Sequence, residues 1–103
     1  MTESISKVKS KKFAIQIVKI YQHLTKEQKE FVLSKQLLRS GTSIGANLAE
    51  TECAISKKDF ISKLYISLKE CSETRYWLEL LHETGYLSDR DFDILHENCI
   101  ELM

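Results

Sequence analysis

The chain has 103 residues, of which 43% are hydrophobic and 29% are charged. This length fits one ordinary domain, and the composition excludes a disordered tail and a membrane-spanning protein. Fifteen basic and fifteen acidic residues cancel, so the chain lacks the strong positive charge of many nucleic-acid-binding proteins. With no proline and only three glycines, turn-forming sequence is too scarce for a many-stranded β fold. We therefore expect one all-α domain over residues 1–103.

The cysteines and the first residues indicate the compartment. Cys53, Cys71 and Cys99 are odd in number and lack CxxC spacing, so we expect buried free thiols in a reducing cytoplasm. The lysines before the apolar stretch FAIQIVKIY resemble the start of a signal peptide. Gln16 and Lys19 interrupt that stretch, however, and no small-residue cleavage site follows. We expect a cytoplasmic protein without membrane contact.

The first expected helix has a wide apolar face. Phe13, Ile17, Ile20 and Leu24 follow one another at steps of four, three and four residues, which places them on one side of a helix. The lysine-rich residues before Phe13 either begin this helix or fray from it, and residues 1–10 could form a basic arm.

The second expected helix runs from residue 26 to about residue 53. Thr25 followed by Gln28 predicts a capping box at its start. Gly41 and Gly45 each cost about 1 kcal/mol relative to alanine in a helix interior, so a break near Gly41 is the alternative. We favour continuation, with glycine where a facing backbone approaches closely. The apolar residues expected on this helix are Phe31, Leu37, Leu38, Ile44 and Leu48.

The third expected helix starts after Ser56, which Asp59 follows three residues later, and ends at a left-handed Gly85. Its core positions alternate steps of four and three, the spacing typical of helices packed in an antiparallel bundle. These core positions are Phe60, Leu64, Ser67, Cys71, Thr74, Leu78 and Leu81.

The fourth expected helix begins after Ser88, with Asp91 in its first turn. Four helices joined by short turns predict an antiparallel up-down-up-down four-helix bundle. In that topology, the turn at residues 54–58 lies at the same end as the basic N-terminal residues. The expected core row of this helix is Phe92, Leu95, Cys99 and Leu102.

Apolar residues are in excess on the third helix. Five of the six positions 76–81 are apolar, and they cannot all face one bundle axis. Either this helix lies at the centre of a wide core, or its flank is covered by another copy of the chain. The residues expected at such an interface are Tyr76, Trp77 and Leu80.

Catalytic motifs are missing from the sequence. It has no GxSxG, no HExxH and no phosphate-binding glycine loop. Glu79 and His82 form one Glu-x-x-His pair, whereas a di-metal bundle needs this motif from two helices. We expect no catalytic residue, no metal site, no cofactor and no enzymatic activity.

Charge is distributed unevenly along the chain. Residues 1–39 hold nine basic and three acidic residues, net +6, and residues 40–103 hold six and twelve, net −6. The two halves either pair with each other internally, or the basic half binds nucleic-acid phosphates in a salt-dependent way. The candidate phosphate contacts are Lys9, Lys11, Lys12, Lys35 and Arg39.

The segment FVLSKQLLRSGTSIGANLAE at residues 31–50, the pair Asp59-Phe60, and ISLKECSETRYWLELLHETGYL at residues 66–87 carry a family resemblance. From Phe13 onward, the chain resembles the bacterial four-helix-bundle family of proteins encoded in 23S rRNA intervening sequences. The accessory variability determinant proteins of diversity-generating retroelements are similar to this family. The resemblance implies a homo-oligomer, typically a pentameric ring with a central channel, that associates with RNA or DNA. In the retroelement branch it also implies a reverse transcriptase as partner.

Two points qualify this resemblance. Retroelement members look more basic than this neutral chain, so a protein-interaction scaffold without nucleic acid remains the alternative. The family motif also carries over four polar residues whose spacing of four, four and three places them on one face of the second helix. This stripe either forms a structural polar network or subunit seam, or it contacts a ligand. Its members are Arg39, Ser43, Asn47 and Glu50.

Overall fold

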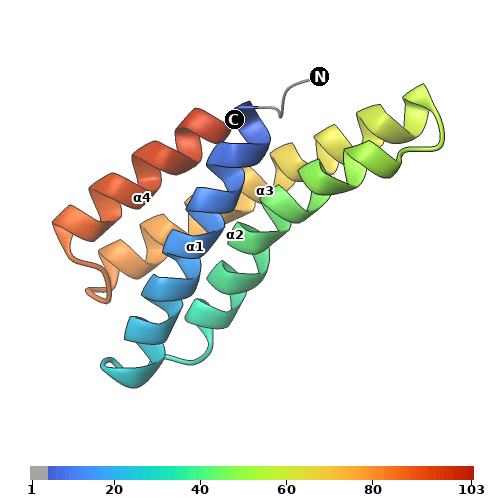
Figure 1. Cartoon of the computed structure of the whole chain (residues 1–103). Helices are drawn as coiled ribbons and strands as arrows, with labels where there is room; N and C mark the ends of the chain where they lie inside the picture. Colours follow the sequence, from blue (N-terminus) through green and yellow to red (C-terminus); the bar gives the residue numbers. More distant parts are fainter. Residues whose placement is uncertain (1–4) are drawn as a thin grey trace.

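The computed structural model describes residues 5–103, and the expected all-α class is confirmed: those residues are largely helical and contain no strand (Figure 1). Within this range, no helix has both the length and the apolar character needed to cross a bilayer. The helices are α1 (Ile5–Lys26), α2 (Leu33–Glu50), the 3-10 helix η1 (Thr51–Cys53), α3 (Lys57–Glu83) and α4 (Asp89–Leu102).

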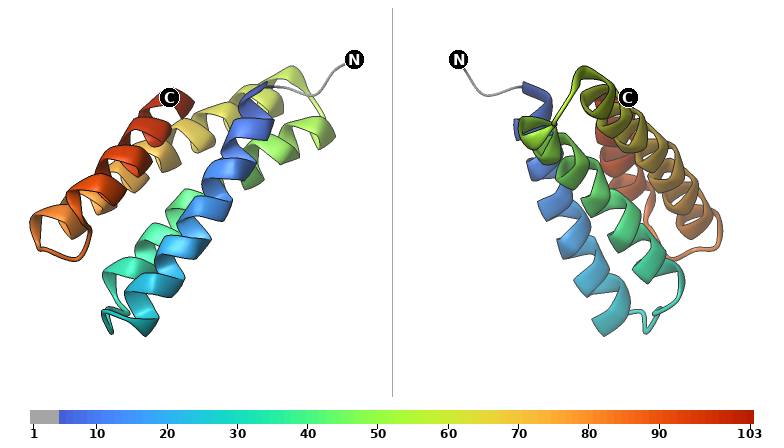
Figure 2. Two further views of the ribbon diagram at one scale, coloured as in Figure 1. Left: turned by 60° about the vertical axis from the view of Figure 1, so that its left-hand side comes forward. Right: turned by 90° about the vertical axis from the view of Figure 1, so that its right-hand side faces the viewer.

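The four α-helices follow one another around a square. α1 packs against α2 and α4, and α3 also packs against α2 and α4, while the backbones of the two diagonal pairs make no close approach within residues 5–103. The α1/α2 edge of the bundle is therefore opposite the α3/α4 edge. The two views of Figure 2 show this arrangement from different sides.

α2 is continuous through both glycines, as the sequence predicts. A Cβ atom at Gly41 would lie only 2.9 Å from Cγ1 of Ile17, and one at Gly45 would lie 3.1 Å from Oγ of Ser10. Glycine thus allows α1 to approach the backbone of α2 closely. The buried core consists of Phe13, Ile17, Leu24, Leu37, Ile44, Cys71, Leu78, Leu81, Leu87, Leu95 and Cys99.

The predicted start of the second helix is wrong. α1 continues to Lys26, and the hydroxyl of Thr25 donates to the carbonyl of Tyr21 within its last turn, at 3.0 Å. The side chain of Gln28 donates instead to the carbonyl of Tyr86, at 3.2 Å. The two residues of the predicted capping box therefore bind other partners.

The buried carboxylate of Glu30 begins α2 instead. It accepts hydrogen bonds from the backbone N–H groups of Val32, Leu33 and Ser34, at 3.2, 3.0 and 2.6 Å. Because these groups have no intrahelical partner, one acidic side chain satisfies the N–H of Val32, which precedes the helix, and those of its first two residues. Phe31 precedes this start and is exposed rather than in the core.

Both predicted ends of α3 and the predicted start of α4 are confirmed, whereas α2 ends at Glu50, before the expected residue 53, and is followed by the 3-10 helix η1. Oγ of Ser56 accepts from the N–H of Asp59 at 3.0 Å, and Oγ of Ser88 accepts from the N–H of Asp91 at 3.1 Å. Gly85 has a φ of 88°, a conformation that glycine adopts without steric cost. These signals succeed because each cap is formed within four consecutive residues.

The basic N-terminal residues form the start of α1. Residues 5–10 are helical, and Ser10 is buried against α2, so they do not form a frayed arm. The rest of the suggested arm, residues 1–4, lies outside the described residues. Lys7 pairs with Glu52 at 2.8 Å, which confirms that the turn after α2 lies at the basic end.

Two of the three cysteines meet the expectation of burial. Cys71 and Cys99 are buried, whereas Cys53 is exposed, and all three are free thiols. Cys53 differs because it lies in η1, at the tip of the α2–α3 hairpin. The thiol of Cys99 donates to the carbonyl of Cys71 at 3.4 Å, so the end of α4 lies beside the middle of α3.

The first part of α3 extends beyond the end of α4 (Figure 1). α3 has 27 residues and α4 has 14, and α4 ends three residues after Cys99. Phe60 and Leu64, both expected in the core, are consequently 42% and 40% exposed. The spacing predicts the apolar face of α3 correctly, but within residues 5–103 no part of α4 covers these two positions.

Candidate functional site

A groove of about 740 Å³ runs between α1 and α2. Its floor is apolar because α2 places Gly45, Ala46 and Ala49 there, opposite Ile15 and Val18 of α1. Small residues at these helical spacings leave the surface hollow. We call this feature the lysine-lined groove, because its rim carries Lys7, Lys11 and Lys19.

Only one of these three lysines forms an ion pair with another described residue. Lys7 forms its ion pair with Glu52, but none of the ion pairs within residues 5–103 involves Lys11 or Lys19. Unpaired ammonium groups beside an apolar floor suit an anionic partner that also has an apolar part.

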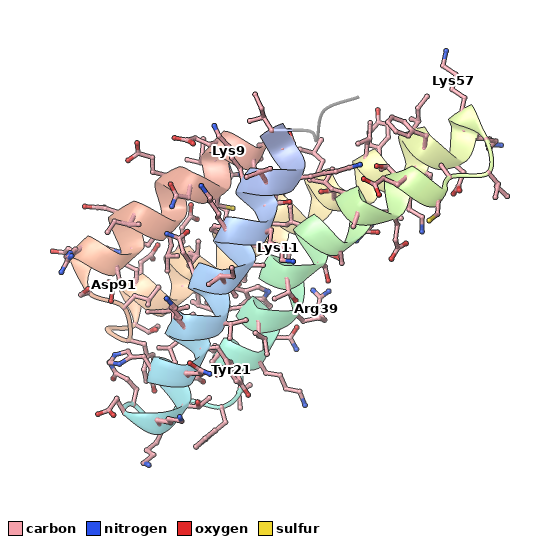
Figure 3. The ribbon with its side chains drawn as sticks, in the orientation of Figure 1. Lys9, Lys11, Tyr21, Arg39, Lys57 and Asp91 are labelled. Atoms are coloured by element: carbon pink, nitrogen blue, oxygen red, sulfur yellow. The ribbon has the colours of Figure 1, made fainter. Side chains whose placement is uncertain are left out.

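The five predicted phosphate contacts do not form one patch. Lys9 and Lys12 line a smaller cavity of about 310 Å³ between α1 and α4, where Lys9 pairs with Glu101 at 3.6 Å. Lys11 lies on the opposite side of α1, toward α2, as Figure 3 shows. Lys35 is exposed near the start of α2. The structure therefore distributes these lysines over several faces.

Arg39 is engaged with α3. Its Nη1 lies 3.3 Å from Oε1 of Glu70, and its Nη2 pairs with Glu73. The hydrogen bond to Glu73 raises the pKa of Arg39 above its ordinary value, and the same bond lowers the pKa of Glu73. Arg39 thus joins α2 to α3, and these carboxylates would compete with a phosphate for it.

The rest of the predicted polar stripe continues along the α2–α3 seam. Oγ of Ser43 donates to the carbonyl of Arg39 at 2.7 Å, and Nδ2 of Asn47 donates to the carbonyl of Ser43 at 2.8 Å. Glu50 pairs with Lys63 of α3 at 2.6 Å. The stripe therefore forms polar contacts within the chain, on a partly exposed flank rather than in a buried network.

The three residues predicted at an interface lie on the outer part of α3. Tyr76 is 56% exposed, and its ring contacts that of Trp77 edge to face, with centroids 5.0 Å apart. The indole N–H of Trp77 donates to Glu73 at 3.0 Å, and Trp77 and Leu80 are half-buried. The indole is thus partly accessible in the single chain.

Sequence reasoning missed a larger exposed surface on α3. Five apolar side chains near its start are each at least 40% exposed, and Ile100 and Met103 at the end of the chain are each 47% exposed. Comparing the expected lengths of the third and fourth helices could have revealed it. We call the five residues of α3 the apolar overhang: Phe60, Ile61, Leu64, Tyr65 and Leu68.

The Glu-x-x-His pair of α3 contributes to packing against α4. The imidazole of His82 stacks on Phe92 with ring centroids 4.2 Å apart, and its Nε2 lies 2.7 Å from Asp89. Glu79 lies 3.0 Å from Nε2 of His96. Within residues 5–103, no three side chains of His, Cys, Asp or Glu are grouped so that they could hold a metal ion.

The chain is similar in sequence and in fold to known proteins. A sequence profile described as 23S rRNA-intervening sequence protein matches residues 3–103. The fold is similar to the 1.70 Å crystal structure of a protein of unknown function from the S23 ribosomal protein family of Bacteroides thetaiotaomicron VPI-5482. The sequences are 53% identical, the match covers 95% of this chain and 88% of that chain, and the TM-score is 0.93. No curated protein matches the sequence.

Proposed function

Because the chain belongs to the family of 23S rRNA-intervening sequence proteins, we propose that it is a non-catalytic, homo-oligomeric accessory protein that binds RNA or DNA in the cytoplasm. Its up-down-up-down bundles assemble into a ring, which the family resemblance suggests is pentameric. The apolar overhang is the observation that carries the assembly. Monomers rarely expose so many contiguous large apolar side chains, and covering them removes apolar surface from water.

The basic character of α1 supports nucleic-acid binding. From Ile5 to Lys26 this helix has six lysines and no acidic residue. Lys9 and Lys12 are exposed on its α4 side, and Lys35 is exposed on α2. Lysines held on a rigid helix attract phosphates with little sequence preference and strong salt dependence.

Self-assembly is tested by size-exclusion chromatography with light scattering. We expect a mass several times the 12.0 kDa of one chain. Trp77→Glu should lower this mass if the flank around Tyr76 and Leu80 belongs to the interface. A monomer at high protein concentration would overturn the proposed assembly.

Gel-shift titrations with structured RNA and duplex DNA, each at two salt concentrations, test nucleic-acid binding. Lys9→Ala/Lys12→Ala should weaken binding more than Lys57→Ala/Lys58→Ala, a control that removes the same charge at the tip of the α2–α3 hairpin. No binding at low salt would refute the nucleic-acid role. Equal weakening in both variants would refute the assignment to Lys9 and Lys12.

A protein-interaction scaffold is the second candidate function. α4 carries five acidic residues and one basic residue, a surface that suits a basic protein partner better than a nucleic acid. Affinity capture from the native cell distinguishes the two functions. A protein partner that persists after nuclease treatment would support the scaffold, and partners lost on nuclease treatment would support the nucleic-acid role.

A further inference from the structure

A row of lysines runs along the outward surface of α1. Lys12, Lys19 and Lys26 follow one another at steps of seven residues, which is close to two full turns, so they lie on one face of the helix. All three are exposed. We call these three residues the α1 crest. At about 1.5 Å per residue, the crest is about 21 Å long.

The hollows on both sides of α1 show that the crest points away from the bundle. Lys19 lines the lysine-lined groove toward α2 and also a hollow of about 320 Å³ toward α4. A side chain that borders a hollow on each side stands on the ridge between them. Figure 3 shows Lys9 and Lys11 on opposite sides of α1, and the crest runs between these two sides.

The ammonium groups of the α1 crest are available to a ligand. No ion pair within residues 5–103 includes Lys12, Lys19 or Lys26. α1 has no acidic residue of its own, so its lysines cannot pair with one another's neighbours along the helix. The helix fixes the spacing of these lysines, while their flexible stems let each charge adjust to an anion.

The carboxylates near α1 lie beside the crest rather than on it. Glu101 of α4 is already paired with Lys9, and Asp91 lines the other hollow toward α4. Asp93 and Glu97 are exposed on α4 but line neither hollow beside α1. A ligand that touches only the crest therefore meets positive charge, whereas one that wraps onto α4 meets carboxylates.

This arrangement favours a stiff duplex over a flexible single strand. Duplex DNA has a persistence length of about 50 nm, so it behaves as a straight rod over the length of the crest and can touch α1 without bending onto α4. Proteins that bind single strands commonly stack the bases on exposed aromatic side chains. On α1, Phe13 is buried and Tyr21 is half-buried, so the crest has no such platform.

We propose that the α1 crest binds the phosphate backbone of duplex nucleic acid without reading its sequence. This inference rests on the proposed nucleic-acid function, and it specifies the form of the nucleic acid and the residues that hold it. Each strand of a B-form duplex carries one phosphate per about 3.4 Å of axis, so the crest spans about six base pairs. DNA and RNA duplexes share this backbone chemistry.

Removal of charge along the crest tests the proposal. Glutamine removes the charge and is a good helix former, so the crest variant replaces its three lysines together. A matched control removes three exposed charges from α3, the helix diagonal to α1. The two variants are Lys12→Gln/Lys19→Gln/Lys26→Gln and Lys57→Gln/Lys58→Gln/Lys69→Gln. A third variant replaces the crest lysines with arginine, which keeps the charge.

Binding is measured by fluorescence anisotropy at several salt concentrations, with duplex DNA, duplex RNA and single strands of equal length. Circular dichroism and light scattering verify that each variant keeps the helical content and mass of the wild type. We expect the wild type to bind a duplex more tightly than single strands. The crest variant should bind it about 50-fold more weakly at low salt, and its salt slope should be smaller by about 2 or more. The control and the arginine variant should change little.

The outcomes separate this inference from the proposed function. If the wild type binds but the crest variant keeps its affinity and salt slope, or if single strands bind more tightly than duplexes, the inference is refuted and the nucleic-acid function stands. A strong preference between two unrelated duplex sequences would also refute it. If neither duplexes nor single strands bind at low salt, both are refuted. Binding of either duplex supports the proposal, and the comparison of DNA with RNA identifies the ligand.

Lysine acetylation of the wild-type protein keeps the inference testable if a variant fails to fold. Acetic anhydride modifies exposed lysines, and mass spectrometry measures the extent of modification at each position. Saturating duplex should slow the acetylation of Lys12, Lys19 and Lys26 several-fold and leave that of Lys57 and Lys58 unchanged. Equal protection of both sets, or protection of the α3 lysines alone, would contradict the proposal.

Discussion

From Glu70 to Glu83, α3 lies against both α2 and α4, whereas from Lys57 to Leu68 it has α2 and η1 beside it but extends past the end of α4. Both halves have the same alternating spacing of apolar residues. Leu78 and Leu81 in the covered half are fully buried, while Phe60 and Leu64 in the other half are about two-fifths exposed. Spacing determines which face of a helix is apolar. The length of the neighbouring helix determines whether that face becomes core of the same chain.

The largest expected difference is in thiol reactivity, between Cys53 at the exposed tip of the α2–α3 hairpin and the buried Cys71 and Cys99 where α3 packs against α4. Burial raises the pKa of Cys71 to about 11 and that of Cys99 to about 12, so the thiolate is scarce at neutral pH. With an aromatic disulfide reagent, we expect Cys53 to react at once, and Cys71 and Cys99 at least about 100-fold more slowly. Cys53→Ser should remove the fast phase. Rapid modification of all three thiols in native protein would contradict the burial of the core pair.

Truncation of matched leucines should give the next largest difference. Leu78→Ala removes a fully buried side chain and should lower the free energy of unfolding by about 2–5 kcal/mol. Leu64→Ala changes a partly exposed residue and should cost clearly less in the separated chains. Urea unfolding measures both, at a protein concentration low enough for the chains to separate. Equal costs at that concentration would mean that α3 is uniformly buried.

The starts of α2 and α3 should differ by a smaller free energy, because Glu30 is a buried cap and Ser56 an exposed one. Burial raises the pKa of Glu30, but hydrogen bonds from the backbone N–H groups of Leu33, Ser34 and Val32 outweigh burial, so its pKa lies below the ordinary value. Glu30→Gln should cost about 1–2 kcal/mol at pH 7, and Ser56→Ala at the exposed start of α3 about 1 kcal/mol or less.

The pH dependence distinguishes these two caps. Because the folded pKa of Glu30 is lowered, its contribution is complete above the unfolded value near 4.5 and decreases as the pH falls toward the folded value. The difference in unfolding free energy between wild type and Glu30→Gln should therefore shrink from pH 7 to pH 3. The cost of Ser56→Ala should change less, since serine does not titrate. A constant cost for Glu30→Gln would show that its charge is not what stabilises α2.

The sequence predicts the class of the fold and most helix ends because these depend on neighbouring residues. Ser56 and Ser88 each accept a hydrogen bond from the N–H three residues later. Gly85 ends α3 because glycine alone adopts its positive φ without steric cost. The capping box predicted at Thr25 and Gln28 is wrong, although its signal is equally local. The long side chain of Glu30 accepts hydrogen bonds from three backbone N–H groups at once, and the helix begins there instead. The contacts of Gln28 and Arg39 could not be predicted, because they depend on which helices become neighbours.

The candidate site was predicted less well, for a related reason. The charge asymmetry between the two halves is visible in the sequence and corresponds to a basic α1 and an acidic α4. Which lysine has a carboxylate partner depends on helix packing, so Lys7, Lys9 and Lys11 could not be distinguished from spacing. The apolar overhang requires the relative lengths of α3 and α4 and the point at which they meet, near Cys71 and Cys99.

The smallest expected effect concerns Arg39, at the boundary between the two halves of α3. Its pairs with Glu70 and Glu73 are partly exposed, and such pairs contribute about 1 kcal/mol or less. Arg39→Ala should therefore lower the unfolding free energy slightly, and the loss should shrink at high salt because ions screen exposed pairs. Its effect on nucleic-acid affinity should be smaller than that of Lys12→Ala, since two carboxylates already neutralise the guanidinium. If Arg39→Ala weakens nucleic-acid binding as much as Lys12→Ala while unfolding is unchanged, the guanidinium acts on phosphates and its pairing with α3 is secondary.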